Sequence, residues 1–388
     1  MPTVETWVNA IEIAGFSICC FALILCMTQL HRMMAYKLLA CLFVLVMVSD
    51  LFDVAAALEV SDPAILKRFL AVSFHSAFIV PPVLLLYVRT LVGEPLVRKR
   101  GEALAHLAVP CIATLLGIAF FPFDPAVSGV APVGSDRPWP STVFATALGA
   151  LPFGFYIQCL VYAALSVRAQ IRHREKLKDL FASTEPYEVR WITGMAVLFG
   201  SFAMLNLFSV VGAAIGLQMH LPDLVDSVLE LLIVVTLGAW GLRQSPGLTG
   251  MQTSHEQMTH VKYEKSALDP ERAERIAGKL QGAMARDQLY RDANLSLASL
   301  SKHVGVTTNY VSQTLNSYLD VSFFDFVNEW RVHAAKPMII EGTQPITLIA
   351  YEVGFNSRSS FYTAFRKNVG MTPSQYLADT RRCAAETG

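Results

Sequence analysis

The chain has 388 residues, of which 53% are hydrophobic and only 16% charged, and its formal net charge is zero. This composition is too apolar for an ordinary soluble protein, and the length allows two or more domains. Residues 1–250 hold 16 Lys+Arg and 17 Asp+Glu, whereas residues 251–388 hold 15 and 14. The first part is therefore charge-poor and membrane-like, and the second, at a formal +1, lacks the basic excess typical of nucleic-acid binders.

Seven apolar runs approach the ~20 residues that a helix needs to cross the hydrocarbon core of a bilayer. They span residues 7–30, 38–58, 69–88, 104–121, 143–167, 191–217 and 224–242. The first run lacks a basic n-region and a small-residue exit, which argues against a cleaved signal peptide. Proline interrupts several of the runs, and we expect kinks at Pro81, Pro82, Pro110 and Pro152.

Basic residues in the connections predict the orientation of these helices. With the N-terminus outside, the inner connections carry the basic residues on which the orientation rests: Arg32, Lys37, Arg89, Arg98, Lys99, Arg100, Arg168, Arg172, Arg174, Lys176 and Lys178. The outer connections carry only Lys67, Arg68 and Arg137. The positive-inside rule therefore predicts an outside N-terminus and a cytoplasmic C-terminal part. Trp7 and Trp139 then fall at the outer interface, and Trp191 and Trp240 at the inner one.

Six ionisable residues inside the runs fall in the outward halves of their helices: Glu12, Asp50, Asp53, His75, Asp226 and Glu230. A charge at bilayer depth costs roughly 2.5–3.5 kcal/mol on insertion scales. One interpretation is an outward-open sensor site for a cation, a proton or a small cationic ligand. The other is that these groups are hydrated near the surface, or protonated and bonded to neighbouring helices.

The seven cysteines show no CxxC or Cys/His spacing, so we expect neither a disulfide framework nor a metal site. Residues 244–262 turn polar and form a linker, which as a flexible chain of ~20 residues spans roughly 25 Å. Residues 269–284 then show a helical period, with Ile276, Leu280 and Met284 on one face.

A helix-turn-helix pattern follows at residues 297–316. Small Ser301 lies four residues before Gly305, which can leave a helix with positive φ, and Thr307 is the expected N-cap of the next helix. Val311 and Leu315 then face inward. The expected outer face of this helix holds Asn309, Ser312, Gln313 and Asn316.

Residues 322–340 form the helix between this pattern and a second one. Ser322 and Asp325 make an S-x-x-D capping signal. About 19 residues at ~1.5 Å give roughly 28 Å, comparable to the ~34 Å between successive major grooves on one face of B-DNA. Pro337 removes a backbone hydrogen bond, so we expect it to kink or shorten the helix.

The second helix-turn-helix pattern covers residues 347–368, within the stretch 345–376. Thr347 is the expected cap of its first helix, Ala350 lies four residues before Gly354, and Asn356 is the expected cap of its second helix. Phe361 and Phe365 face inward. The expected outer face of this second helix holds Arg358, Ser359, Tyr362, Thr363 and Arg366, and such a face can enter a major groove.

Two such patterns, 49 residues apart at their glycines, carry more weight than one. Together with the run GF-N-S-x-S-x-F-x-x-x-F-R-x-x-x-G-M-T-P-S-Q-Y, they resemble the AraC/XylS family of bacterial transcription regulators. YEKSALDPE, NLSLASLSKHVGV and VSFFDFVNEWRV are similar to its membrane-bound subgroup, in which a multi-span domain precedes the DNA-binding part. Leu377 departs from the arginine that the family often has after the tyrosine.

The resemblance implies roles for residues that helical geometry already places outward. Base contacts fall on Asn309, Ser312 and Gln313 in the first motif, and on Arg358, Ser359, Tyr362 and Thr363 in the second. Phosphate contacts fall on Lys302, Thr307, Asn356, Arg366 and Lys367. Arg358 is the expected guanine reader, because its guanidinium pairs bidentately with guanine acceptors. The helix at 322–340, with Arg331 and Ala335, is similar to the family's linker helix.

The sequence thus predicts an all-α protein with three parts. Residues 1–243 form a seven-helix transmembrane sensor domain, 244–262 a linker and 263–382 an AraC-type DNA-binding domain, followed by a tail at 383–388. Its expected place is the bacterial inner membrane, multi-pass. The expected partners are double-stranded promoter DNA, RNA polymerase, the lipid bilayer, a second copy in a homodimer, and an unknown small-molecule, ion or protein signal.

No nucleophile–base pairing, phosphate loop or metal cluster supports an enzyme, and no cofactor is expected. Two alternatives to a sensing regulator stay open. The chain could be a membrane receptor or transporter whose helix-turn-helix pair binds protein. The membrane part could also only anchor and dimerise a regulator.

Overall fold

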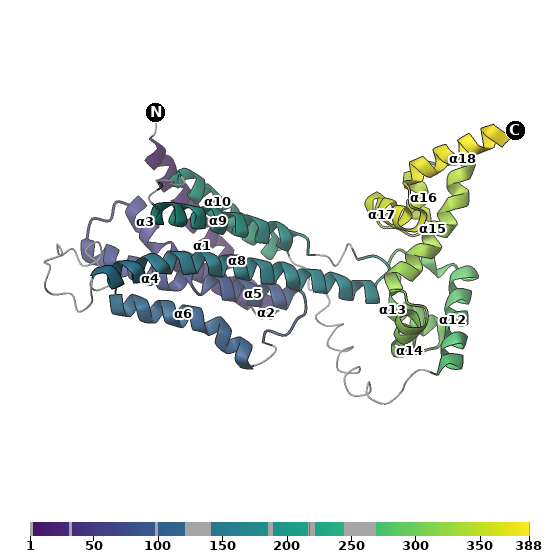
Figure 1. Ribbon diagram of the computed structural model, residues 1–388, viewed down its shortest axis with the longest axis horizontal. Helices are drawn as coiled ribbons and strands as arrows, with labels where there is room; N and C mark the ends of the chain where they lie inside the picture. Colours follow the sequence, from purple (N-terminus) through teal and green to yellow (C-terminus); the bar gives the residue numbers. More distant parts are fainter. Residues whose placement is uncertain are drawn as a thin grey trace. The chain divides into compact units, whose positions relative to one another are not determined.

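The computed structural model describes residues 3–30, 33–97, 100–120, 141–184, 189–215, 217, 222–243 and 269–387. Within these ranges the chain is helical, apart from turns and one isolated antiparallel bridge between Phe181 and Ser296. The predicted all-α class is therefore confirmed for the described residues (Figure 1). Arg32, Arg98, Lys99, Arg137, Trp139 and the linker at 244–262 lie outside them.

By their contacts the helices form two compact units. Unit 1 comprises Met1–Ile171 and Val189–Thr249, and unit 2 comprises Arg172–Glu188 and Gly250–Gly388. The short piece Arg172–Glu188 thus groups with the C-terminal residues, although in the chain it lies between two long apolar helices.

Unit 1 packs its helices through small residues. Its helices are α1 (Val4–Gln29), α2 (Met34–Ser49), α3 (Leu51–Ala57), α4 (Pro63–Ala77), α5 (Val80–Leu91), α6 (Arg100–Phe120), α8 (Ser141–Leu180, whose last turns belong to unit 2), α9 (Trp191–Ala214) and α10 (Asp223–Gly241). On α10, a Cβ added at Gly238 would contact Ala22 and Phe43 at 3.9 Å. A Cβ added at Gly241 would lie 3.0 Å from the Tyr87 hydroxyl and from a Leu39 methyl. Such close approach is typical of helix pairs in membranes.

The predicted count of seven spans is wrong for the described residues. Four helical stretches are long and apolar enough to cross a membrane: Val4–Gln29, Ala150–Leu180, Trp191–Gly212 and Asp223–Gly241. The count rises to six if two bent pairs each make one span, the pair α2 and α3 (50°) and the pair Arg68–Ala77 and α5 (40°). The fourth predicted run corresponds to α6, whose described apolar part, Gly101–Leu116, is shorter than a span.

Proline and a buried carboxyl account for these breaks. Pro81 and Pro82 occupy the first positions of α5, where a missing N–H is tolerated, so the predicted bend there is confirmed. Asp50 ends α2 with φ −92° and ψ 0°, outside helical geometry. Pro110 and Pro152 lie inside α6 and α8, which continue through them.

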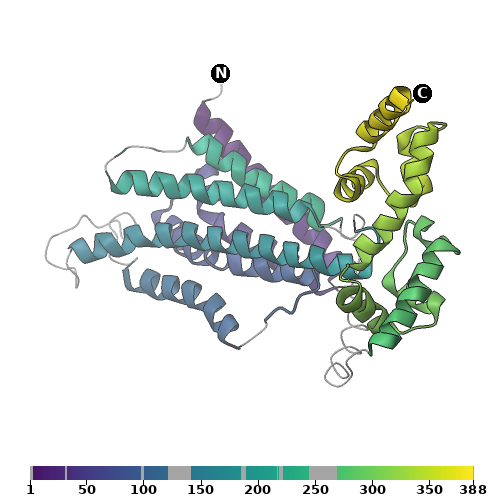
Figure 2. The same cartoon turned by 45° about the vertical axis from the view of Figure 1, so that its right-hand side comes forward.

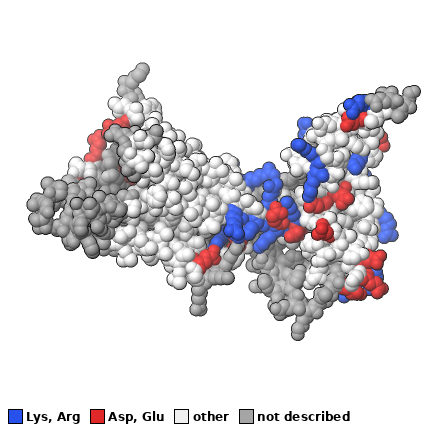
Figure 3. Space-filling model, viewed as in Figure 1, with Lys and Arg blue, Asp and Glu red and all other residues white. Residues whose placement is uncertain are grey.

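Much of the outside of unit 1 is apolar. Large side chains that are more than half exposed include Phe21, Ile24, Met27, Leu104, Leu107, Ile112, Leu115, Val197, Met204 and Phe208. In the view of Figure 3, most of the described surface of unit 1 is uncharged. Contiguous apolar surface of this kind marks a protein or membrane interaction site.

Unit 2 has two hydrophobic clusters joined by one long helix. Its helices are α12 (Pro270–Ala285), η3 (Leu289–Arg291), α13 (Leu297–Val304), α14 (Thr308–Gln313), the π-helical turn η4 (Thr314–Tyr318), α15 (Phe323–Glu341), α16 (Ile346–Glu352), α17 (Arg358–Val369) and α18 (Pro373–Thr387). α15 contributes Phe323, Phe326 and Val327 to the first cluster, and Val332, Ala335 and Ile339 to the second. Both views show α15 running from one group of helices to the other (Figure 1; Figure 2).

The two predicted helix-turn-helix motifs are α13 with α14 and α16 with α17. Gly305 and Gly354 have φ values of +67° and +98°, as the turns require. Thr307 and Ser322 occupy the predicted N-cap positions; Ser322 Oγ accepts from the Asp325 N–H at 3.1 Å, whereas the Thr307 side chain makes no cap hydrogen bond. Pro337 does not shorten its helix, because α15 continues to Glu341.

Two predicted N-caps are wrong. Ser357, not Asn356, caps α17, since its Oγ accepts from the Ser360 N–H at 3.1 Å. Pro345, not Thr347, precedes α16. At α17 the adjacent Asn356 and Ser357 are both good cap residues, so the backbone geometry decides which one is used, whereas the N-cap residue of α16 is a proline that makes no side-chain cap bond.

Gly354 offers a sharp test of unit 2. A Cβ there would collide with the carbonyl of Tyr290 and lie 2.9 Å from that of Arg291, whereas a Cβ at Gly370 (φ +85°) meets nothing within 4 Å. We expect Gly354→Ala to destabilise unit 2 by about 2–5 kcal/mol and Gly370→Ala by about 1–2 kcal/mol, since only the first adds a backbone clash to the left-handed strain. Hydrogen exchange of the α13 and α15 amides in the full chain measures both. Equal losses would contradict this account of the Gly354 contact.

Candidate functional site

The second helix of the distal motif, α17, presents a polar outer face. Phe361 and Phe365 are fully buried, while Arg358, Ser359, Thr363 and Arg366 are exposed and Tyr362 is half-buried. This matches the face predicted for a major-groove reader. The two phenylalanines pack into the second hydrophobic cluster, where Phe361 contacts the Phe355 ring at 5.3 Å and Phe365 the Tyr376 ring at 5.5 Å, and these contacts outside α17 fix the rotation of the helix about its axis.

Arg358 is held in place before any ligand arrives. Its guanidinium carbon lies 4.9 Å from the centre of the Tyr362 ring, and Nη2 donates to the Tyr362 hydroxyl at 3.2 Å. The hydrogen bond with Ser374 and the nearby Arg358 lower the pKa of Tyr362, because both stabilise the phenolate. Tyr362 therefore positions a guanidinium that keeps donor groups free for a base edge.

The first reading helix, α14, is less exposed than expected. Val311 and Leu315 are buried as predicted, but Asn309, Ser312 and Gln313 are half-buried rather than exposed. Within the described part of the chain, the amide oxygens of Asn309 and Gln313 are buried without a hydrogen-bond partner. An unpaired buried oxygen is costly, and an adenine N6 amino group is a donor that could satisfy it.

The residues assigned to phosphate are exposed, but two of them are already engaged. Lys302, Thr307 and Arg366 are exposed. Lys367 Nζ forms an ion pair with Asp325 Oδ1 at 2.6 Å, and Asn356 Nδ2 donates to the Ala293 carbonyl at 3.2 Å. A phosphate contact by Lys367 would therefore have to compete with the Asp325 carboxylate.

In unit 1 the structure gathers five of the six ionisable residues singled out in the sequence. Glu230 lies within electrostatic range of Glu12, Asp50, Asp53 and Asp226. Among the described residues, no group of three or more His, Cys, Asp or Glu side chains could hold a metal ion. These five residues lie on α1, at the break between α2 and α3, on α3 and on α10. We call them the carboxyl cluster.

Two other helices, α8 and α9, connect to the carboxyl cluster through hydrogen bonds that end at Asp226. Asn206 Nδ2 donates to Asp226 Oδ1 at 2.7 Å, and the Tyr156 hydroxyl donates to Asn206 Oδ1 at 3.3 Å. The sixth residue, His75, contacts the Ala71 carbonyl and the Phe74 ring of its own helix.

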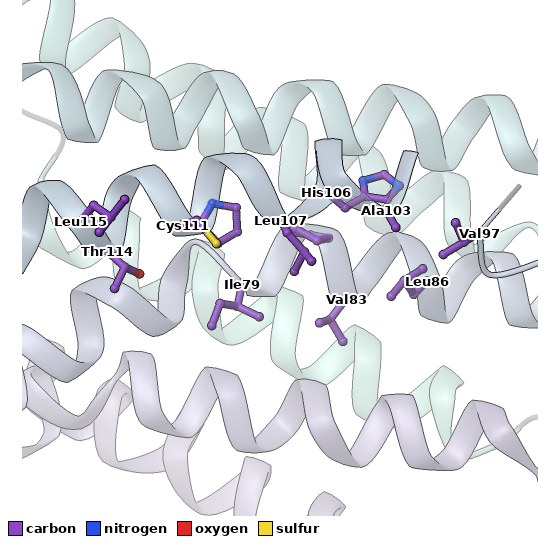
Figure 4. Close-up of a pocket in the computed structure, with 12 residues that line it drawn as sticks. Ile79, Val83, Leu86, Val97, Ala103, His106, Leu107, Cys111, Thr114 and Leu115 are labelled. Atoms are coloured by element: carbon purple, nitrogen blue, oxygen red, sulfur yellow. The ribbon is translucent and has the colours of Figure 1, made fainter. Parts of the chain in front are cut away.

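Unit 1 also holds an apolar cavity of about 640 Å³ that sequence reasoning missed. Figure 4 shows it between α5 and α6, lined by Ile79, Pro82, Val83, Leu86, Val97, Ala103, His106, Leu107, Pro110, Cys111, Thr114 and Leu115. Its volume is within the range of small-molecule sites. The sequence feature that could have predicted this cavity is the i, i+4 series of apolar residues on both helices, with a single histidine among them.

His106 connects this cavity to a buried polar network. Its Nδ1 lies 2.7 Å from the Tyr162 hydroxyl, and its Nε2 lies 3.9 Å from Glu102. Glu102 pairs at 2.5 Å with the buried Arg89, which also donates to the Leu96 carbonyl at 3.0 Å. The predicted inner-loop residue Arg89 is thus part of the packing between α5 and α6.

Comparisons with known proteins agree on the C-terminal part. Residues 300–379 match a helix-turn-helix domain family. A stretch of 92 residues is 35% identical to an uncharacterized HTH-type transcriptional regulator of Staphylococcus aureus (strain COL), covering 24% of this chain and 12% of that protein. A stretch of 93 residues is 29% identical to the melibiose operon regulatory protein of Escherichia coli (strain K12), covering 24% and 31%.

Two solved structures are also similar over the C-terminal part. One is a protein of unknown function from Listeria innocua, at 24% identity over 26% of this chain and 95% of that one, with a TM-score of 0.24. The other is the C-terminal domain of AraT, a response regulator from Geobacillus stearothermophilus, at 27% identity over 29% and 88%, also with a TM-score of 0.24.

Residues 300–379 of the chain are therefore similar to a helix-turn-helix domain, and the stretches matched in the two curated relatives belong to transcriptional regulators. The matched part is about a quarter of the chain, and it spans a minor share of the curated relatives. The four to six long apolar helices lie before it in the sequence.

The Tyr362 ring predicts a graded effect on DNA binding. Tyr362→Phe keeps the stacking surface under Arg358, whereas Tyr362→Ala removes it. We expect the Ala variant to bind DNA selected by the wild-type full chain about tenfold more weakly, and the Phe variant within about threefold of wild type, since cation–π stacking is worth ~0.5–2 kcal/mol. Fluorescence anisotropy measures both. Equal effects would show that the ring does not position Arg358.

Proposed function

We propose that the protein is a membrane-embedded, one-component transcription regulator that binds promoter DNA through both helix-turn-helix motifs. The observation that carries the proposal is the pairing, in one chain, of an AraC-type domain with four to six helices long and apolar enough to cross a membrane. The proposed nucleic-acid partner is double-stranded promoter DNA. The proposed protein partners are RNA polymerase and a second copy of the chain.

The proposed organisation follows the sequence boundaries. Residues 1–243 form the membrane domain, 244–262 the linker, 263–382 the DNA-binding domain and 383–388 the tail. The positive-inside rule favours an outside N-terminus and a DNA-binding part in the cytoplasm of a bacterial inner membrane, an arrangement that requires an odd number of spans, as when one of the two bent pairs crosses the membrane. The reading residues are Asn309, Ser312, Gln313, Arg358, Ser359, Tyr362 and Thr363. The phosphate residues are Lys302, Thr307, Asn356, Arg366 and Lys367.

The membrane domain is proposed to sense a signal rather than only to anchor the chain. The carboxyl cluster supports this, because five carboxyl groups gathered among membrane helices are costly to maintain without a role. The residues of the proposed sensor site are Glu12, Asp50, Asp53, Asp226 and Glu230, and the sequence pattern adds His75 to them.

The proposal is tested with the full chain in lipid nanodiscs and a random double-stranded DNA library. Selection should enrich sites with two short motifs about one helical turn apart, because the two reading helices address successive major grooves. A protein-interaction role for the motifs, which the near-zero charge of residues 251–388 favours, predicts no enrichment over empty nanodiscs.

Two arginines on α17 should separate base reading from phosphate binding. We expect Arg358→Ala to cost ~1–3 kcal/mol and to relax selectivity at one base position. Arg366→Ala should weaken binding equally on all sequences and reduce the salt slope by about one. Binding curves on selected and single-base-changed DNA at several salt concentrations measure both. Uniform weakening by Arg358→Ala would reassign that residue to phosphate.

Neutralising the carboxyl cluster should change signalling. We expect Asp50→Asn, Asp53→Asn, Asp226→Asn and Glu230→Gln, made singly, to shift reporter transcription from a selected promoter by at least about threefold, since each alters the charge of the cluster. Glu5→Gln is the matched control, because Glu5 is exposed on α1, the helix that also carries Glu12. Unchanged output in all four cluster variants would remove the sensing role, and the anchoring alternative would then hold.

A further inference from the structure

Four residues that follow α8 are built into unit 2. Phe181 forms an antiparallel bridge with Ser296, and the Ala182 N–H donates to the Leu295 carbonyl at 3.0 Å. Ala182, Ser183 and Thr184 are buried, and Ala182 belongs to the first hydrophobic cluster of unit 2. In the chain this segment directly continues α8, which carries one of the four span-length stretches. We call residues 181–184 the strap.

The strap completes the environment of a fully buried arginine on α15. Arg331 Nε donates to the Tyr290 carbonyl at 2.8 Å, and Nη2 donates to the Asp292 carbonyl at 2.9 Å. Nη1 donates to the Ala182 carbonyl at 3.2 Å and to Ser183 Oγ at 3.3 Å. A buried guanidinium must have its donors satisfied, and the strap supplies two of the acceptors.

Arg331 lies where the two helix-turn-helix motifs meet. Tyr290 and Asp292 belong to the connection that leads into α13, the first helix of the proximal motif. The Phe355 ring, just after the turn glycine of the distal motif, is 5.3 Å from the guanidinium carbon. We call each helix-turn-helix motif a reading head. The strap therefore binds the residues that set the position of one reading head relative to the other.

We propose that the surface formed by Leu295, Ser296 and Arg331 is a docking site for the strap of the same chain. Through the docked strap, the end of α8 controls how the two reading heads are held. Docking keeps both heads in the arrangement that engages two grooves, and release of the strap loosens it. Only the effect on DNA rests on the proposed function, because docking itself is independent of DNA.

Disulfide trapping in native membranes tests docking directly. Bridged cross-strand residues have Cα atoms about 4.5–5.5 Å apart, which suits a disulfide. The full-length Phe181→Cys, Ser296→Cys double variant should form the 181–296 disulfide at least tenfold faster than the control double variant Phe181→Cys, Lys302→Cys, because Lys302 lies about 9 Å further along α13. Mass spectrometry of the linked peptides measures both rates.

Two outcomes of the trapping experiment would overturn the docking. One is an equal rate for the two double variants. The other is a disulfide found mainly in covalent dimers, which would make the occupant a second copy rather than the same chain. Trapping within the monomer supports the proposal whether or not the protein binds DNA.

The consequence for DNA binding is tested by Ala182→Pro, which removes the N–H donor to Leu295. In nanodiscs, we expect this variant to bind the two-motif DNA selected by the wild-type chain at least tenfold more weakly, with Ala182→Gly close to wild type. Oxidation of the triple variant that adds the 181–296 cysteine pair should restore binding, and reductant should abolish the restoration.

The trapping and binding experiments distinguish control by the strap from the proposed DNA-binding function. Wild-type affinity in Ala182→Pro, or a loss that the disulfide does not restore, would overturn control of the reading heads by the strap. If the wild-type chain selects no DNA, the proposed function fails, and the trapping rates alone decide whether the strap docks.

Discussion

The burial of the Arg331 guanidinium is the constraint on which the arrangement of unit 2 depends. Its side chain is fully buried and donates to the Tyr290 carbonyl within η3, to the Asp292 carbonyl that follows η3, and to the strap. Removing partners from a buried charge costs about 3–5 kcal/mol, so the elements that carry these acceptors are held together. One residue of α15 thereby ties the approach to α13, the turn of the distal motif and the end of α8 into one body.

In the membrane location proposed for unit 1 a different constraint applies, because lipid supplies no hydrogen bonds to the backbone. Helices satisfy their own backbone groups, and polar side chains must find partners among neighbouring helices. Asn206, placed between Tyr156 and Asp226, and the network from Arg89 to Tyr162 are both built in this way. The same interior contains the carboxyl cluster and the cavity beside His106, so unit 1 is equipped with polar groups that anchoring alone does not require.

The sequence predicted the turns and buried faces of single helices better than it predicted contacts between distant parts of the chain. Gly305 and Gly354, and the buried pairs Val311 with Leu315 and Phe361 with Phe365, follow from spacing of three to five residues. The span count failed because hydropathy measures apolar length and does not detect a bend such as the one at Asp50. The contact between Arg331 and Ala182 joins residues 149 positions apart, and no local pattern encodes it.

A regulator held in a membrane must bind specific promoters while it stays there. A genome-wide binding map of the full-length protein, cross-linked in living cells and recovered from the membrane fraction, measures this. We expect discrete enriched promoters that share two motifs about one helical turn apart, and their loss in a strain that carries Arg358→Ala together with Gln313→Ala. A map without discrete sites, or one unchanged in that strain, would contradict that expectation.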